Sequence, residues 1–405
     1  MKNNAFRERF AAFSVGTLRL QFRKKGRFRH AKAVTADMKQ IPSAFQTTPV
    51  VYAVGRDYQI MVPVTCETLM WVQVGDRCYY DDSNGILRSG TSTHRMTVPM
   101  EELDEAGRYT VCFRRMIKRK PYRSETGEIE RYESSFRPVP ARRPLHIYHI
   151  SDSHNRVEGP VAAGKYFGDE LDLLILNGDI PNHSGEIAFL ATIHEIASKI
   201  TGGEIPVIFS RGNHDTRGVY AENIADHTPT RGGVSYFSFR VGSLWGLVLD
   251  CGEDKPDDHV EYGHTICCED FRRRETEYIR SVIRHAKEEY EADGVVNRIV
   301  ISHNPFAQDY APPFNIENDT YTEWMRLLRE HIKPQLTLHG HVHECHISLP
   351  GSKYDQRGQS CPAICGSRLE DDRFIGCALT LDETGCRVVF NDSNGKVSGD
   401  EYLRF

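Results

Sequence analysis

Short runs of β-branched and aromatic residues dominate the first third of the chain. Turn-forming pairs such as Gly75-Asp76 and Asn84-Gly85 separate many of them. The runs cover residues 50–54, 58–62, 69–74, 95–98 and 109–113. Short strands at this spacing are typical of a β-sandwich. We therefore predict an all-β sandwich domain, of fibronectin or immunoglobulin type, over residues 46–140.

After residue 144 the pattern changes, because apolar strand-like runs now alternate with helical periodicity. Helical patterns cover residues 184–200, 270–290 and 319–332. This alternation predicts a layered α/β (α+β) domain over residues 145–405. Three prolines within residues 137–144 predict a semi-rigid linker before it. Residues 1–45 remain as a basic N-terminal segment.

Composition narrows the class of protein. The chain has 405 residues, of which 39% are hydrophobic and 26% charged, which is an ordinary balance for two folded domains. No apolar run approaches the roughly 18–20 residues that a membrane-spanning helix needs. The polar start of the chain also argues against a secretory signal. Eleven cysteines, an odd number, fit reduced thiols better than a disulfide framework, so we expect a cytoplasmic protein.

Charge is divided unevenly between the two halves. Residues 1–143 carry 26 Lys and Arg against 15 Asp and Glu, whereas residues 144–405 carry 25 against 41. Seven basic residues and no acid lie between Arg19 and Lys32. This stretch is interpreted first as a pair of solvated strands. A contact to a nucleic-acid backbone or an anionic lipid is the alternative.

Polar residues that can bind metals follow five of the strand-like runs in the second half. They stand in the sequences Ser151-Asp152-Ser153-His154, Asn177-Gly178-Asp179, Ser210-Arg211-Gly212-Asn213-His214-Asp215, Ser302-His303-Asn304-Pro305 and His339-Gly340-His341-Val342-His343. Active sites of α/β proteins lie at the carboxyl ends of sheet strands. Any one of these residues alone could be a strand-end cap, but five sets in chain order predict an active site.

The order Asp-x-His, Gly-Asp, Gly-Asn-His-Asp, His and Gly-His-x-His resembles the calcineurin-like metallophosphoesterases. The resemblance covers about residues 144–345. It implies a fold of two packed β-sheets flanked by helices, with a dinuclear metal site between loops. The β-sandwich in front resembles the architecture of purple acid phosphatases. Their iron-binding Tyr is absent, since Asn182 stands in its place.

The resemblance also implies a role for each motif residue. Asp152, His154 and His343 would bind one metal; Asn213, His303 and His341 would bind the other; Asp179 would bridge both. His214 would act as general acid or phosphate stabiliser, and Asp215 would help to orient it. This mixture of carboxylate, imidazole and amide ligands suits Mn, Fe or Zn, with Ni or Co as further choices.

Three residues near these motifs are candidates for substrate binding. His183 follows the bridging aspartate by four residues, although a plain loop histidine fits the sequence as well. Arg211 and Arg217 flank the Gly-Asn-His-Asp motif, where each could pair with phosphate oxygens or form an ordinary salt bridge.

The predicted function is metal-dependent hydrolysis of a phosphomonoester or phosphodiester, by in-line attack of a hydroxide that bridges two divalent transition-metal ions. The predicted partner is a small phosphorylated substrate. One alternative is a nuclease that uses the basic N-terminal region. The other is a scaffold that keeps the fold without catalysis. Nothing in the sequence decides the oligomeric state.

Overall fold

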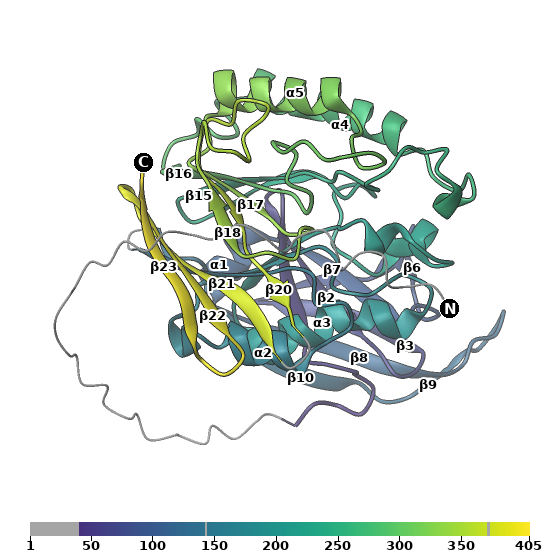
Figure 1. Ribbon diagram of the computed structural model, residues 1–405. Helices are drawn as coiled ribbons and strands as arrows, with labels where there is room; N and C mark the ends of the chain where they lie inside the picture. The colour runs from purple at the N-terminus through teal and green to yellow at the C-terminus, as the bar shows by residue number, and fades with distance from the viewer. Residues whose placement is uncertain (1–39, 142–143, 371–372) are drawn as a thin grey trace. The chain divides into compact units, whose positions relative to one another are not determined.

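A large mixed sheet forms the centre of the fold in the computed structural model, which describes residues 40–141, 144–370 and 373–405 (Figure 1). Most of the predicted basic segment, residues 1–39, lies outside the described residues. Residues 41–405 make up one compact unit. The strand order of the large sheet is β23-β22-β21-β11-β12-β13-β1-β2-β7, with β20 attached to β21. These strands are β1 (Val50–Val54), β2 (Asp57–Pro63), β7 (Thr93–Pro99), β11 (Leu145–Ile150), β12 (Leu173–Asn177), β13 (Pro206–Ser210), β20 (Arg368–Leu369), β21 (Phe374–Leu381), β22 (Gly385–Asp392) and β23 (Val397–Arg404).

A second sheet of six strands carries the other half of the predicted site. Its order is β14-β15-β16-β17-β19-β18. The strands are β14 (Phe237–Val241), β15 (Leu244–Val248), β16 (Asn297–Ile301), β17 (Leu336–His339), β18 (His346–Ser348) and β19 (Ala363–Cys365). The central strands β15 and β17 are buried along their whole length, as in sheets covered on both faces.

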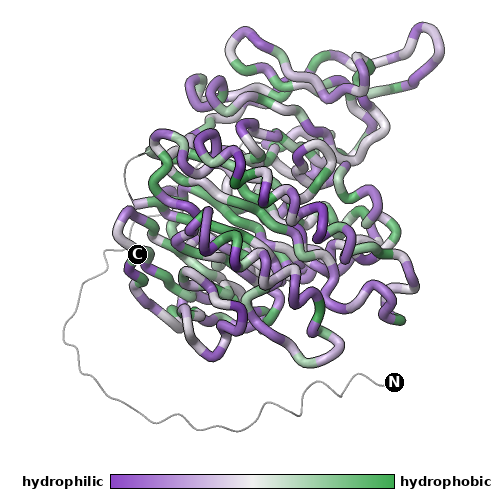
Figure 2. The backbone as a smooth tube through the Cα atoms, turned by 90° about the horizontal axis from the view of Figure 1, so that it is seen from above, coloured by the Kyte–Doolittle hydropathy of each residue, from purple (hydrophilic) through white to green (hydrophobic). Residues whose placement is uncertain are grey.

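Helices pack against both sheets. The helices are α1 (Met100–Ala106), α2 (Glu158–Gly164), α3 (Ile187–Thr201), α4 (Cys268–Arg284) and α5 (Asn318–Leu327), which continues as a π-helical turn over Leu328–Ile332. Side chains of α3 such as Ile193 pack against the large sheet, and Trp324 of α5 packs against the second sheet. In Figure 2 hydrophobic stretches run through the middle of the molecule, and hydrophilic ones are frequent on its outer coils and loops. Two sheets flanked by helices confirm the predicted fold class.

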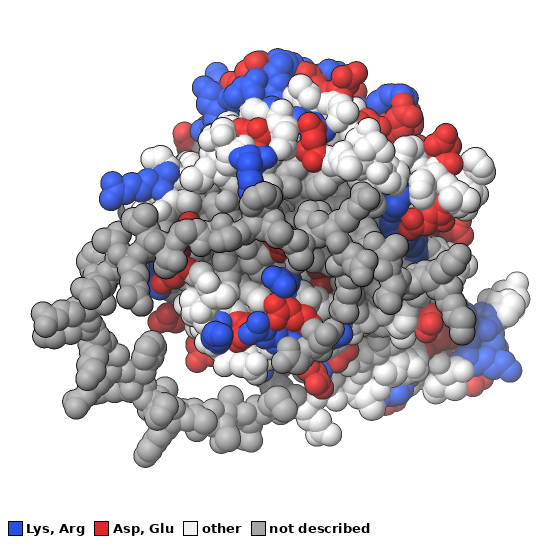
Figure 3. All heavy atoms as spheres, in the orientation of Figure 1, with Lys and Arg blue, Asp and Glu red and all other residues white. Residues whose placement is uncertain are grey.

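Charged side chains alternate in sign along the exposed faces of α4 and α5. Arg273 pairs with Glu269, Arg274 with Asp270, and Arg326 with Glu330, all four residues apart. The upper part of Figure 3, where Figure 1 places these helices, accordingly mixes blue and red atoms. Such pairs keep the helix surface polar.

The N-terminal region is rich in strands, as predicted, and shares its core with the rest of the unit. Strand β1 pairs in parallel with β13, and β2 and β7 extend the large sheet beyond it. The other strands form a separate sheet and a small hairpin: β3 (Thr68–Val74), β4 (Arg77–Tyr80), β8 (Arg108–Lys118), β9 (Glu125–Thr126), β10 (Glu130–Ser135), β5 (Asp82–Ser83) and β6 (Ile86–Leu87).

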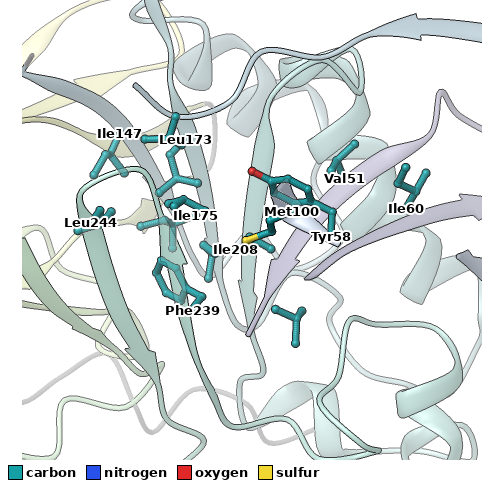
Figure 4. Close-up of a cluster of buried hydrophobic side chains, with 14 of the residues drawn as sticks. Val51, Tyr58, Ile60, Met100, Ile147, Leu173, Ile175, Ile208, Phe239 and Leu244 are labelled. Carbon is teal, nitrogen blue, oxygen red and sulfur yellow. The ribbon is translucent and has the colours of Figure 1, made fainter. Parts of the chain in front are cut away.

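One hydrophobic cluster joins the two halves of the chain. Figure 4 shows Val51 and Ile60 of the N-terminal strands in the same cluster as Ile175, Ile208 and Phe239. Each of these side chains is at least 99% buried. The predicted division into domains 46–140 and 145–405 stays a prediction about independent folding. In the folded unit, the two segments contribute strands to one sheet.

Candidate metal centre

The predicted metal ligands all lie at one edge of the two sheets. Strands β11, β12 and β13 of the large sheet and β16 and β17 of the second sheet end there. The loops that follow these strands carry Asp152, His154, Asp179, Asn213, His303, His341 and His343. The structure therefore brings together seven residues that span almost 200 positions of the sequence.

Backbone conformation marks these loops as unusual. Five of the seven residues have a positive φ angle: 55° at Asp152, 45° at His154, 52° at Asp179, 68° at His341 and 54° at His343. Non-glycine residues rarely adopt this left-handed region, which costs of order 1–3 kcal/mol per residue and clusters at active sites. The cost indicates that the fold holds these side chains in set directions.

Asp152, His154 and His343 form a first group, whose ligand atoms lie within 4.8 Å of one another. The Nε2 atom of His343 is 3.1 Å from Nε2 of His154 and 3.3 Å from Oδ1 of Asp152. Asp152 is fully buried, and the Ser151 hydroxyl donates a hydrogen bond to its Oδ2 over 2.6 Å. The His343 side chain is 49% exposed, so the group is open to solvent on one side.

Asp179, His303 and His341 form a second group at the same spacing. The Nε2 atom of His303 lies 3.1 Å from Oδ2 of Asp179. Its Nδ1 is 2.7 Å from the carbonyl oxygen of Asn177 and donates to it, which fixes the ring and turns Nε2 toward the group. A third group of His154, Asp179 and His214 connects the two.

The side-chain oxygen of Asn213 faces the second group, 3.0 Å from Nδ1 of His341. Three acceptor atoms, from Asn213, His341 and Asp179, then point toward one another, which suits a cation between them. Turning the amide over gives a different set of contacts. Its NH₂ would donate to His341 and to Asp179 Oδ2 at 3.3 Å, and its oxygen would accept from Arg217. The first orientation is that of a metal ligand, and the second satisfies the site by hydrogen bonds.

The electrostatics of the site also call for positive charge. Asp152 and Asp179 are both buried, and an unpaired buried carboxylate is strongly unfavourable. Burial alone would lower the pKa of His303, but the carboxylates of Asp179 and Asp152 raise it to about 10. Burial would raise the pKa of Asp179, and the histidines around it, His303 above all, lower it instead. The Nε2 atom of His303 nevertheless makes no hydrogen bond to a described residue. The donor set therefore fits divalent cations.

The predicted general acid, His214, borders both groups. Its backbone N–H donates to Oδ1 of Asp179 over 2.8 Å, and its Nε2 lies 3.9 Å from Oδ2 of the same residue. The Nδ1 atom is 2.8 Å from the carbonyl oxygen of Asn182, to which it donates. The ring is thereby held with Nε2 facing the groups.

Asp215 lies next to His214 in sequence but has a different contact. Its Oδ2 accepts a hydrogen bond from the backbone N–H of Gly212 over 2.7 Å, and the side chain is fully buried. Burial and the nearby Asp179 raise its pKa well above the usual range. The carbonyl of Asn182, and not this carboxylate, bonds to the His214 ring. A catalytic role for Asp215 stays a prediction.

The three candidate substrate residues differ in their surroundings. Arg211 is partly buried, with 16% of its side chain exposed, and pairs with Asp250 at 2.6 Å. Arg217 donates two parallel hydrogen bonds of 2.8 Å to the buried carboxylate of Glu253. His183 is half-buried, and its Nδ1 accepts from the N–H of Gly185. Both arginines already have acidic partners, so their contact with substrate stays a prediction.

Sequence reasoning missed several residues that support the site. Asn177 holds His303 through its carbonyl, and Asn182 holds His214 in the same way. Backbone carbonyls carry no residue-type signal, so the sequence could not indicate them. Asp254 lies 3.8 Å from Nε2 of His341. Several acidic residues stand between positions 253 and 258, and the sequence does not indicate which of these carboxylates approaches the site.

The comparisons with known proteins agree with this geometry. Residues 145–345 match the family model of the calcineurin-like phosphoesterases. A purple acid phosphatase from yellow lupin (Lupinus luteus) seeds is similar in structure, with a TM-score of 0.54 and 12% identity over 89% of this chain and 75% of that one. PhoD is similar with a TM-score of 0.51 and 11% identity, over 89% and 93% of the two chains. At these identities the two structures support the fold alone. The comparison with curated proteins found no match.

The fold and the converging ligands define a metal-dependent phosphoesterase, an enzyme that hydrolyses phosphoester bonds. More particularly, the chain carries a calcineurin-like phosphoesterase domain, which confirms the resemblance predicted from its motifs. The family and the ligand groups indicate divalent metal ions. Within the part of the chain that the structure describes, no helix is long and apolar enough to cross a membrane.

Proposed function

We propose that this enzyme hydrolyses a small phosphorylated substrate, a phosphomonoester or a phosphodiester, by in-line attack of water at a centre of two divalent transition-metal ions. The observation that carries the proposal is the set of three ligand groups, in each of which the ligand atoms lie within 4.8 Å of one another. His154 belongs to the first and the third group, and Asp179 belongs to the second and the third. Two separate metal sites would not share residues in this way, whereas a dinuclear centre requires it.

The proposed ligands follow the groups. Asp152, His154 and His343 hold one ion. His303 and His341 hold the other with Asn213, and Asp179 contacts both, as its place in two of the three groups suggests. Imidazole and amide ligands beside only two carboxylates favour Mn, Fe or Zn over Mg or Ca. When bound, two such ions activate water and offset the charge of the phosphoryl group.

His214 is the proposed proton donor to the leaving oxygen. Its Nδ1–H is committed to the carbonyl of Asn182 at 2.8 Å, so the proton for the leaving group must come from Nε2. The working form is therefore the imidazolium, with both nitrogens protonated. The ring is 29% exposed, so a substrate can reach it from solvent.

His183 remains part of the proposal as a phosphate contact. Its Nδ1 is occupied by the N–H of Gly185, and the ring packs 4.8 Å from that of Phe189, centroid to centroid. These contacts orient the ring and leave Nε2 for a phosphate oxygen. A cytoplasmic location is also proposed, on the odd number of cysteines in the sequence.

The test compares hydrolysis of p-nitrophenyl phosphate and bis-p-nitrophenyl phosphate by metal-stripped protein reloaded with Mn²⁺. We expect turnover of at least one compound, and the preferred one separates monoesterase from diesterase. Replacing His214→Ala should leave two ions bound per chain and slow turnover about 10²-fold or more. His331→Ala, at an exposed histidine outside the site, is the matched control and should behave like the wild type.

Full activity of the His214→Ala variant would refute its role as proton donor. Binding of fewer than two ions by the wild type, measured by elemental analysis after dialysis, would refute the dinuclear centre. Two bound ions without turnover of either compound would contradict hydrolysis of simple phosphoesters.

A further inference from the structure

The hairpin between β8 and β9 extends beyond the sheet to which β8 belongs. Strand β8 runs from Arg108 to Lys118, but its pairing with β3 ends at Arg115. Beyond that point its partner is the two-residue strand β9. Figure 1 shows this hairpin projecting at the right of the view. The hairpin tip, residues 117–124, therefore stands free of the sheet.

The hairpin tip combines exposed apolar side chains with positive charge. Its sequence, Ile117-Lys118-Arg119-Lys120-Pro121-Tyr122-Arg123-Ser124, contains four basic residues and no acid. Tyr122 is 87% exposed and Ile117 is 67% exposed. The register of β8 shifts between Met116 and Lys118, on either side of Ile117. A bulge of this kind re-aims a side chain, which accounts for an isoleucine directed at solvent.

Contacts to a neighbouring turn widen the apolar surface. Arg119 donates hydrogen bonds of 3.0 Å to the carbonyl of Leu87 and 2.9 Å to the hydroxyl of Ser89. These bonds fix the hairpin tip beside the β5–β6 turn, where Ile86 is 60% exposed. Three large apolar side chains from two turns are thus exposed in one region of the surface.

Much of the positive charge at the tip is available. Lys120 pairs with Glu125 at the start of β9, whereas Lys118 and Arg123 form no ion pair with any residue that the structure describes. Figure 3 shows blue atoms gathered on this projecting hairpin. Basic residues near an anionic bilayer contribute about 1 kcal/mol each, which is about fivefold in binding.

We propose that the hairpin tip docks the enzyme on an anionic lipid surface. Tyr122 suits the headgroup region, because its ring is apolar and its hydroxyl is polar. The isoleucines enter the boundary with the acyl chains, and Lys118 and Arg123 meet the lipid phosphates. A single-stranded nucleic acid is less suited to this surface. Stacking of bases requires aromatic platforms along a groove, whereas two of the three exposed side chains are aliphatic and the tip projects.

The test measures co-sedimentation of the full chain with vesicles of phosphatidylcholine and phosphatidylglycerol (70:30) and of phosphatidylcholine alone. We expect binding to the anionic vesicles that weakens with salt. The double variant Lys118→Gln/Arg123→Gln should bind about 25-fold more weakly, at fivefold per charge. Ile117→Ser/Tyr122→Ser should also weaken binding, by about tenfold.

Two exposed positions elsewhere supply matched controls. Leu349→Ser removes an apolar side chain that is 49% exposed, and Arg273→Gln removes a charge on α4 that is 62% exposed. Both controls should bind vesicles like the wild type. All variants should keep the wild-type melting temperature, since none of the changed side chains is buried.

Equal partitioning of the tip variants and the wild type would overturn the proposal. Absence of binding to the anionic vesicles at low salt would do the same. Binding of a single-stranded RNA 20-mer that depends on the tip residues, without vesicle binding, would assign the surface to nucleic acid instead.

Discussion

Gly212 allows a metal-site carboxylate to lie directly against the loop that carries Asn213. A Cβ atom at this position would be 2.3 Å from Oδ1 of Asp179 and 2.4 Å from its backbone N, whereas Cβ atoms are essentially never found within 3.0 Å of another heavy atom. Oδ1 of Asp179 also accepts the backbone N–H of His214 over 2.8 Å. The Gly212→Ala variant must therefore move the carboxylate, the loop or both.

The size of the effect follows from this overlap of at least 0.6 Å relative to that 3.0 Å limit. Overpacking of a buried site costs about 1–3 kcal/mol. At about 2.1 cal/mol/K per residue, 2 kcal/mol lowers the melting temperature of a chain of this length by about 2–3 °C. The affinity for metal should also fall, by about 10–100-fold, which is the typical loss when the groups that hold a metal ligand in place are displaced.

The assay is calorimetric titration of metal-stripped Gly212→Ala with Mn²⁺, together with a thermal unfolding curve. Gly90→Ala is the matched control, because an added Cβ at Gly90 has no described atom within 4 Å. Two Mn²⁺ ions bound with wild-type affinity would refute the argument that Gly212 keeps Asp179 in place. Gly340→Ala should act on the first ligand group instead, since its Cβ would lie 2.6 Å from Oδ2 of Asp152.

Three further outcomes are expected. Arg217→Gln should lower the free energy of unfolding by about 3–5 kcal/mol, because the buried Glu253 loses its partner; a raised KM with unchanged stability would instead make Arg217 a substrate contact. Burial lowers the pKa of His194 from 6.5 to about 4. Between these two pH values His194 binds a proton in the unfolded chain but not in the folded chain. The free energy of unfolding should therefore fall as pH drops from 6.5 toward 4. His194→Gln removes the titrating ring. This variant should lose about 2 kcal/mol less stability than the wild type between pH 7 and pH 5 in urea unfolding, and equal losses would contradict the lowered pKa. Chelation by EDTA should abolish hydrolysis and lower the melting temperature, and Mn²⁺ should restore both; activity that survives complete removal of metal would contradict the proposed centre.

The sequence indicated which residues converge at the candidate site, because its motifs follow strands. A run of apolar residues that ends in Asp-x-His or Gly-Asn-His-Asp fixes where a strand stops and which side chains follow. Parallel strands end at a common edge, so Asp152, Asp179 and Asn213 had to meet once the sheet formed. The helix Ile187–Thr201 begins three residues after the predicted start and ends one residue after the predicted end. The reason is again local, because apolar residues recur at helical spacing along the whole segment.

Pairing between distant segments could not be predicted in the same way. Nothing in Val50–Val54 indicates that this strand aligns beside Pro206–Ser210, about 150 residues later. A buried strand presents the same apolar pattern to any partner, and the choice depends on how the whole core packs. For this reason the prediction of a sandwich over residues 46–140 grouped β1, β2 and β7 with the other N-terminal strands. In the structure these three strands belong to the large sheet.

The sequence by itself determined the types and order of the candidate ligands and the strands that present them. Only the tertiary structure decided what holds those ligands. The carbonyls of Asn177 and Asn182 orient His303 and His214, and acidic partners occupy Arg211 and Arg217. Residue type sets what a side chain can bind, and a sequence motif records that directly. The packing of segments far apart in the chain decides which carbonyl or carboxylate lies within 3 Å of a given side chain. No local pattern in the sequence records that choice.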